Sequence, residues 1–127
     1  MNAASIKVLI VDDEDAVRET LADFLGDEGF QVSDVSNAEK GLTLIATQEV
    51  HVAVVDIRLP GMNGVNFIRH AQELQPKTRY LIFTGSVDFS VPETLAHLGF
   101  QDKCLFSKPL PDMSMMVRAI LGLMEEG

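Results

Sequence analysis

Short apolar runs alternate along this chain with stretches in which apolar residues recur every three or four positions. The runs lie at 7–11, 52–56, 79–84 and 104–107, and 30–35 alternates apolar and polar residues as an edge strand does. The run VAVVD at 52–56 stays apolar on both faces until its last residue, which is typical of a parallel strand covered by helices on both sides. These five segments are predicted to be β-strands.

A stretch with helical spacing follows each run, and local signals mark the ends of several helices. Asn37 and Asn63 are good N-caps for the second and third helices, and Pro76 closes the third. Ser90 and Glu93 form a capping box for the fourth helix. The predicted inner faces carry these apolar residues: Val17, Leu21, Phe24 and Leu25; Ala38, Leu42, Ile45 and Ala46; Phe67, Ile68, Ala71 and Leu74; Leu95 and Leu98; and Met113, Met116, Val117, Ile120, Leu121 and Met124.

Five strands alternating with five helices predict βαβ units and a doubly wound, open and mostly parallel α/β sheet. We expect the strand order 2-1-3-4-5, with the reversal between the first and third strands. In such sheets ligands bind outside the carboxyl ends of the strands at the reversal. The chain has 127 residues, 46% of them hydrophobic, so we expect a single domain over residues 1–127.

The net charge is −9, from 19 acidic and 10 basic residues. Such a chain repels phosphate backbones, so we expect no direct nucleic acid binding by this domain. Cys104 is the only cysteine, which excludes an intramolecular disulfide and fits a reducing cytoplasm. No apolar run approaches the ~18 continuous residues of a membrane span. We therefore expect a cytoplasmic protein with no membrane partner and a buried Cys104 thiol.

Four of the predicted strands end in an ionisable or hydroxyl residue. The first ends in Asp12 and Asp13, the third in Asp56, the fourth in Thr84 and the fifth in Lys108. The second strand ends without such a residue and looks like an edge with no role in a site. Three carboxylates in one crevice repel one another, and Mg²⁺, which prefers oxygen ligands, resolves the repulsion. Lys108 can pair with the same carboxylates or with an incoming anion.

Taken together, these motifs resemble the response-regulator receiver domain (CheY-like), the phospho-accepting half of two-component signalling. The similarity extends from IKVLIVDDED through VVDIRLPGMNG and FTGS to FSKPL, essentially end to end. The resemblance implies a flavodoxin-like (βα)5 fold and phosphorylation of Asp56 by a sensor histidine kinase or phosphotransfer protein. It also implies that Mg²⁺ binds Asp12, Asp13, Asp56 and the main-chain carbonyl of Arg58. A cis Lys108–Pro109 bond is common in the family.

The resemblance further implies that Thr84 and Lys108 contact the phosphoryl group. Phosphoryl transfer needs an in-line nucleophile and cations over the equatorial oxygens, and Asp56 is the centrally placed nucleophile. We take Asp13 as the direct metal ligand and place Asp12 nearer the rim, acting through water, and the sequence leaves open which of the two binds the metal directly. Pulling Thr84 inward would shift the loop after the fourth strand, as in a phosphorylation switch. A receiver catalyses its own phosphorylation and dephosphorylation and is not a conventional turnover enzyme.

Two positions depart from the family pattern. Receivers usually carry a tyrosine or phenylalanine three residues before the lysine, whereas this chain has Leu105 there and Phe106 one step later. We interpret Phe106 as a core residue, so of the two parts of the family's switch this chain keeps the Thr84 part, and the aromatic part is in doubt. The second departure is Arg58, for which two interpretations stand. It is either an exposed rim residue without a kinetic role or a side chain that lies across the site and slows autodephosphorylation.

Three other functions share some of these sequence features. A flavodoxin-like redox carrier needs a phosphate-cradling loop after the first strand, where this chain has VDDEDA, which would repel FMN phosphate. A small aspartate-based phosphohydrolase matches the spacing of Asp13 and Asp15, but the chain has little room for a cap over the site. A phosphorylation-independent receiver-like interaction module is disfavoured by the complete acidic set with Thr84 and Lys108.

The partner that receives the signal is not encoded in any motif of this chain. We expect a downstream output domain or protein, and a homodimer stays open. The chain is either a free-standing receiver or a fragment of a longer protein. The residues Met124, Glu125 and Glu126 could continue the last helix, which favours the fragment.

Overall fold

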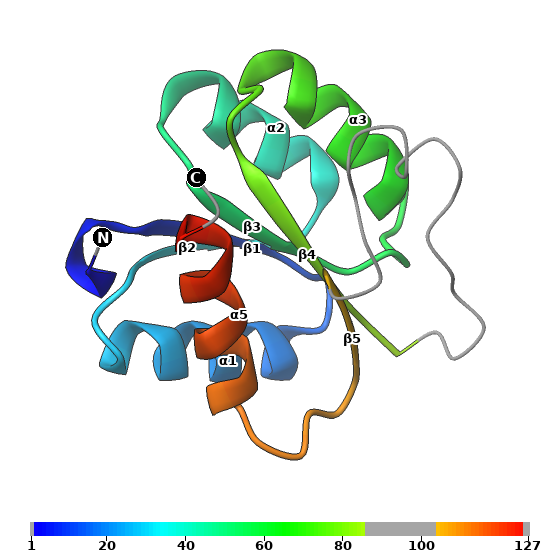
Figure 1. The fold of residues 1–127 in the computed structure, drawn as a ribbon. Helices are drawn as coiled ribbons and strands as arrows, with labels where there is room; N and C mark the ends of the chain where they lie inside the picture. Colours follow the sequence, from blue (N-terminus) through cyan, green and yellow to red (C-terminus); the bar gives the residue numbers. More distant parts are fainter. Residues whose placement is uncertain (1, 86–103, 126–127) are drawn as a thin grey trace.

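The computed structural model describes residues 2–85 and 104–125, and its central feature is a five-stranded parallel sheet (Figure 1). The strands are β1 (Lys7–Val11), β2 (Gln31–Val35), β3 (Val52–Val55), β4 (Arg79–Thr84) and β5 (Leu105–Ser107). Their order in the sheet is β2-β1-β3-β4-β5, and all four neighbouring pairs are parallel. The predicted α/β class and strand order are therefore confirmed, with strand ends within one residue of those expected.

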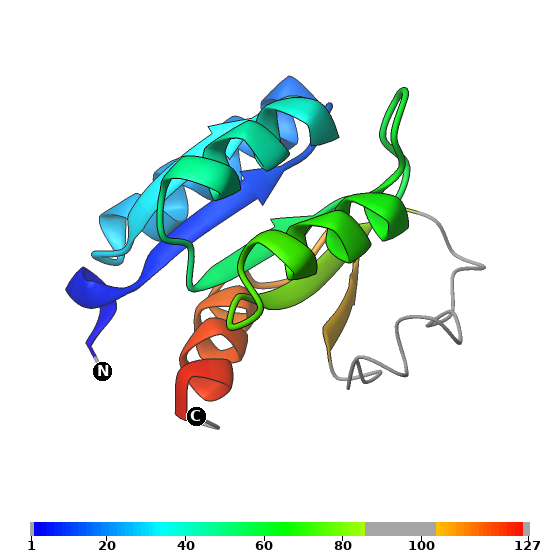
Figure 2. The same cartoon turned by 90° about the horizontal axis from the view of Figure 1, so that it is seen from above.

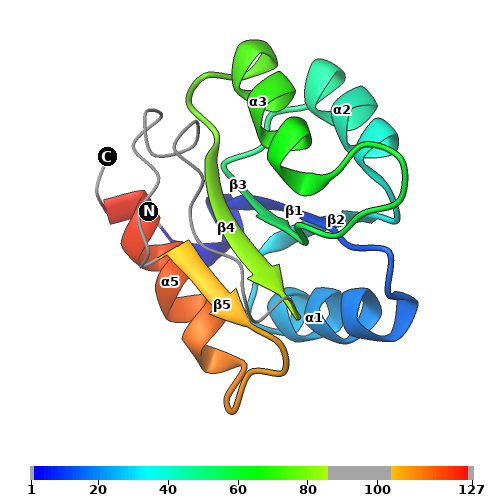
Figure 3. The ribbon, with the colours of Figure 1, turned by 90° about the vertical axis from the view of Figure 1, so that its right-hand side faces the viewer.

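Two layers of helices cover the sheet. After a short 3-10 turn, η1 (Ala3–Ser5), the helices are α1 (Asp15–Asp27), α2 (Ala38–Thr47), α3 (Gly64–Leu74) and α5 (Ser114–Glu125). Helices α1 and α5 cover one face and α2 and α3 cover the other, where these two lie side by side (Figures 2 and 3). The fourth predicted helix, with Ser90, Glu93, Leu95 and Leu98, lies outside the described residues. The prediction of Ala46 and Leu74 on inner helix faces is wrong, because both lie in the last turn of their helices and are exposed. Within the described ranges, no helix is long and apolar enough to cross a membrane.

The strand residues alternate between two buried clusters, which explains their unbroken apolar character. In β3, Val52 and Val54 pack toward α1 and α5, while Ala53 and Val55 pack toward α2 and α3. All four residues of this strand are buried. A strand that is buried on both faces can place only its end near solvent, so polar chemistry is confined to residues that follow the strands.

Two asparagine caps fix the starts of α2 and α3, and one close contact brings α3 against the end of β3. The side chains of Asn37 and Asn63 accept hydrogen bonds from the amides of Lys40 and Asn66, so both predicted N-caps are confirmed. Gly64 begins α3 against the end of β3, where an added Cβ would lie 2.9 Å from the Cα of Ile57 and would clash with the carbonyl of Asp56. Only glycine allows this approach.

Candidate functional site

Three carboxylates meet between the ends of β1 and β3, where the strand order of the sheet reverses. The amide of Asp12 donates to the carbonyl of Val35 at 3.2 Å, and the amide of Asp56 donates to the carbonyl of Val11 at 3.0 Å. These bonds extend the sheet ladder by one residue and fix both aspartates at its edge. One carboxylate oxygen each from Asp12, Asp13 and Asp56 lie within 4.8 Å of one another. The predicted convergence of the acidic residues is therefore observed.

Lys108 reaches this cluster from the end of β5. Its Nζ lies 2.7 Å from Oδ2 of Asp12, 2.9 Å from Oδ2 of Asp56 and 3.1 Å from Oε1 of Glu14. The amide of Lys108 donates to the carbonyl of Thr84 at 2.9 Å, which holds the base of the lysine against the end of β4. The Lys108–Pro109 peptide bond is cis, in agreement with the resemblance. The ammonium group is thus shared among carboxylates from separate parts of the chain.

The electrostatics of the cluster follow from burial and from this shared ammonium. Burial raises the pKa of Asp12 above its ordinary value, although the hydrogen bonds from Lys108 and from the amide of Glu14 oppose the rise. Burial also acts to lower the pKa of Lys108. The hydrogen bonds to Asp12, Asp56 and Glu14 outweigh this effect, so the pKa of Lys108 lies well above its ordinary value. The lysine is therefore a fixed positive charge at neutral pH.

The two acidic residues after β1 differ in exposure from what we expected. Asp12 is 3% exposed and bonds directly to Lys108, whereas Asp13 is exposed. The placement of Asp12 nearer the rim is therefore wrong. The reason is the ladder bond from Asp12 to β2, which draws this residue into the sheet and leaves Asp13 as the first residue of the loop. Asp12 Oδ1 then accepts from the amide of Glu14 at 2.9 Å.

The other predicted site residues flank this cluster. Thr84 is buried at the last position of β4 and pairs in register with Ser107 of β5. Arg58 is exposed, and its amide donates to Oδ1 of Asp56 at 3.0 Å. The backbone two residues after Asp56 therefore turns back toward the carboxylate.

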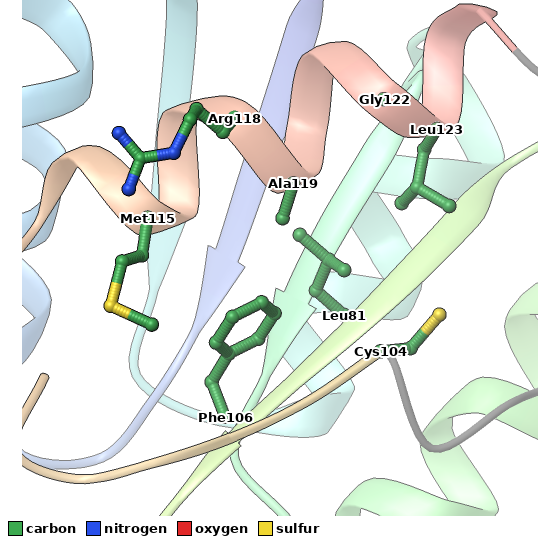
Figure 4. A pocket seen from close by; sticks show the side chains of 8 residues that line it. All are labelled: Leu81, Cys104, Phe106, Met115, Arg118, Ala119, Gly122 and Leu123. Atoms are coloured by element: carbon green, nitrogen blue, oxygen red, sulfur yellow. The ribbon is translucent and has the colours of Figure 1, made fainter.

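Leu105 and Phe106 point to opposite faces of the sheet. Leu105 packs with the α2 and α3 cluster, and Phe106 packs with the α1 and α5 cluster. Figure 4 shows the Phe106 ring beside Leu81 beneath α5, in a hollow of about 430 Å³ that Cys104 also lines. Phe106 is partly buried and packs against the core, in line with its interpretation, and the predicted burial of Cys104 is confirmed. The position three residues before the lysine holds an aliphatic side chain.

Two residues of the site were missed from the sequence. Glu14 is the third partner of Lys108, and Arg18 of α1 forms a salt bridge to Asp34 of β2 at 2.9 Å. β2 is an edge strand, as expected, and it contacts the neighbourhood of the site indirectly, through the carbonyl of Val35 on the amide of Asp12 and through Asp34 on Arg18. The acidic run after β1 was the available signal for Glu14. The spacing of residues in the sequence contains no signal for the contacts of Arg18.

The donor set suits a hard divalent cation. Carboxylate oxygens are the ligands that Mg²⁺ prefers, and this ion commonly uses one or two carboxylates and keeps several waters. Asp12, Asp13 and Asp56 supply three such groups within reach of one another. The described residues therefore fit a magnesium site.

Comparison with known proteins agrees with this geometry. Residues 8–120 match the response regulator receiver domain family. The chain is 30% identical to a probable chemotaxis protein CheY of Rhizobium etli, over 97% of this chain and 98% of that protein. It is also 30% identical to the transcriptional regulatory protein FixJ of Azorhizobium caulinodans, over 93% of this chain and 56% of that protein.

A CheY-like receiver domain from Methanospirillum hungatei superposes with a TM-score of 0.79 at 25% identity, covering 96% of this chain and 98% of that one. Several curated relatives are much longer, and the chain spans between 18% and 56% of their length. The chain therefore belongs to the response regulator receiver domain family, the phospho-accepting signalling domains of two-component systems.

Proposed function

We propose that Asp56 accepts a phosphoryl group from the phosphohistidine of a sensor histidine kinase or phosphotransfer protein. A carboxylate oxygen of Asp56 attacks phosphorus, an O–P bond forms, and the P–N bond breaks with its electron pair staying on the imidazole. The observation that carries the proposal is the lysine ammonium shared by Asp56 and Asp12, at 2.9 and 2.7 Å, where the ends of β1, β3 and β5 meet.

The residues around Asp56 divide the work of transfer. The ammonium of Lys108 neutralises the carboxylate before attack and then balances the charge of the bound phosphoryl group. Asp12, Asp13, Asp56 and the carbonyl of Arg58 are proposed to hold Mg²⁺, which when bound offsets charge on the phosphoryl oxygens. The bond from the Arg58 amide to Oδ1 of Asp56, at 3.0 Å, limits rotation of the carboxylate.

Phosphorylation replaces one negative charge at Asp56 by a group with nearly two charges and three acceptor oxygens. The hydrogen bonds of the Lys108 ammonium must then be redistributed among Asp12, Glu14 and the new oxygens. The hydroxyl of Thr84 is proposed to move toward the phosphoryl group. Because the carbonyl of Thr84 accepts from the amide of Lys108 at 2.9 Å, the end of β4 and the base of the lysine move together. We propose this coupled movement as the switch that an output domain or protein reads in the cytoplasm.

The test is incubation with acetyl phosphate and Mg²⁺, followed by intact mass measurement. Wild-type protein should gain one phosphoryl group, and Asp56→Asn should gain none. Asp27→Asn, a substitution of the same kind at the far end of α1, is the matched control and should be phosphorylated as the wild type is. Chelation of Mg²⁺ should abolish the adduct.

Two results would contradict the proposal. An unmodified wild-type mass under these conditions and with a panel of phosphorylated histidine kinases would favour a receiver-like interaction module. Continued turnover of phosphate esters, with many phosphates released per protein, would favour an aspartate-based phosphohydrolase.

A further inference from the structure

Arg18 connects three segments of the chain beside the carboxylate cluster. Its side chain is 12% exposed, and its three guanidinium nitrogens have separate acceptors. Nη1 donates to the main-chain carbonyl of Asp12, Nη2 pairs with Oδ1 of Asp15 and Nε pairs with Oδ2 of Asp34, each at 2.9 Å. The rigid fork of an arginine therefore ties together the end of β1, the first turn of α1 and the strand β2.

The bond to the Asp12 carbonyl fixes the direction in which Asp13 leaves the sheet. That carbonyl belongs to the same planar peptide group as the amide of Asp13, so holding the oxygen holds the whole plane. The amide of Asp12 is held on its other side by the carbonyl of Val35 at 3.2 Å. Glu14, the N-cap of α1, makes no capping hydrogen bond with its side chain. Arg18 therefore provides the main side-chain restraint on the peptide that joins the two acidic residues.

Charge and geometry make opposite predictions for this residue. A cation beside three carboxylates weakens the attraction of the site for a second cation, so charge alone predicts tighter Mg²⁺ binding when Arg18 is removed. Its positive charge is already paired with Asp15 and Asp34. If Arg18 instead orients the ligands, its removal should weaken Mg²⁺ binding.

We propose that Arg18 is a positioning residue that orients Asp12 and Asp13 for binding of the divalent cation. The inference rests on the magnesium site of the proposed function and adds to it a residue that does not touch the metal. Groups that orient metal ligands typically change metal affinity 10–100-fold when they are replaced. Among residues 2–85 and 104–125, Arg18 is the one whose side chain bonds to the backbone between the two ligands while it is anchored to β2.

The test is a Mg²⁺ titration of the unphosphorylated protein in which the amide chemical shifts around residues 12–14 report binding. Arg18→Met and Arg18→Lys should both weaken Mg²⁺ binding about tenfold or more. Arg69→Met, an exposed α3 arginine, makes the same charge change as Arg18→Met and should bind as the wild type does. Arg18→Lys keeps the net charge, so weaker binding in this variant cannot come from electrostatics. The amide spectrum of Arg18→Lys without metal shows whether this variant is folded. If Arg18→Met does not fold, the Mg²⁺ affinity of Arg18→Lys alone tests the role of Arg18.

Phosphorylation by acetyl phosphate gives a second readout. The Mg²⁺ concentration for half-maximal rate should rise in Arg18→Lys, whereas the rate at saturating Mg²⁺ should stay near that of the wild type. Wild-type affinity in both Arg18 variants, or tighter binding in Arg18→Met, would overturn the role of Arg18 while leaving the proposed function intact. Failure of the wild type itself to bind Mg²⁺ would overturn both.

Discussion

The Nζ of Lys108 lies 2.9 Å from Oδ2 of Asp56, and both side chains are largely withdrawn from solvent, at 9% and 4% exposure. A buried ion pair contributes less to stability than its Coulomb energy suggests, because both charges lose hydration. Removing one partner is a different matter, since it leaves the other charge buried without compensation. Here the same ammonium also serves Asp12, so its loss would leave two buried carboxylates facing each other.

Replacement of Lys108 by methionine should therefore destabilise the protein and block its chemistry. We expect the free energy of unfolding at neutral pH to fall by roughly 3 kcal/mol, and phosphorylation by acetyl phosphate to become very slow. Urea unfolding with a chelator present measures the first effect, and intact mass measures the second. Lys7→Met removes an exposed pair with Glu49 at 3.7 Å and should change stability by less than about 0.5 kcal/mol. Equal effects of the two substitutions would contradict the importance of burial.

Gly64 and Gly122 form a matched pair for testing how tightly the site is built. An added Cβ at Gly64 would collide with the carbonyl of Asp56, whereas one at Gly122, inside α5, would meet nothing within 4 Å. Gly64→Ala should cost about 1–3 kcal/mol of stability through forced displacement, and it should slow phosphorylation of Asp56. Gly122→Ala should stabilise the protein by up to about 1 kcal/mol. Thermal unfolding and the rate of phosphate incorporation measure both variants, and an unaltered rate in Gly64→Ala would contradict the predicted displacement of Asp56.

The sheet and its strand-end residues could be predicted because each depends on a local pattern. A strand buried on both faces, such as β3, requires an unbroken apolar run, and parallel strands must bring their carboxyl ends to one edge. Asp56 and Lys108 are therefore brought together by topology alone. The exposure of Asp12 and Asp13 could not be predicted in this way. It depends on one ladder bond to Val35, which decides where β1 ends.

The contacts of Arg18, like the exposure of Asp12 and Asp13, depend on tertiary structure and not on a local sequence pattern. An arginine four residues after Glu14 on a helix faces several possible acceptors, and only the packing of α1 against β2 selects Asp34. The different faces of Leu105 and Phe106 follow from strand alternation, so the packing of Phe106 against the core could be predicted once the strand was known.

Replacement of Arg58 by asparagine tests whether its long side chain limits dephosphorylation. The Arg58 amide donates to Oδ1 of Asp56 at 3.0 Å, which places the root of the side chain at the mouth of the site. We expect Arg58→Asn to lose the phosphoryl group severalfold faster, because a shorter side chain leaves more room for the attacking water. The decay of the adduct after removal of acetyl phosphate measures this rate. An unchanged rate would identify Arg58 as an exposed rim residue without a kinetic role.

Tyr80 carries a buried hydroxyl with no hydrogen-bond partner, the single such side-chain group within residues 2–85 and 104–125. Desolvation of an unpaired polar group is unfavourable, so Tyr80→Phe should stabilise the protein by about 1 kcal/mol at neutral pH. Thr78→Val is the matched control, because the buried Thr78 hydroxyl donates to the carbonyl of Val50 at 2.8 Å and its loss should destabilise.

The pH dependence of the Tyr80→Phe effect follows from the direction of the tyrosine pKa. Burial raises the pKa of Tyr80 above its ordinary value of 10.0, so above this pH the unfolded chain loses the phenol proton while the folded protein retains it. Folding stability then falls as the pH rises, because the folded state binds more protons. Phenylalanine has no such proton, so the advantage of Tyr80→Phe should widen above pH 10. Urea unfolding of both proteins at neutral and alkaline pH measures this difference, and a constant difference would mean that the Tyr80 hydroxyl is solvated in the folded state.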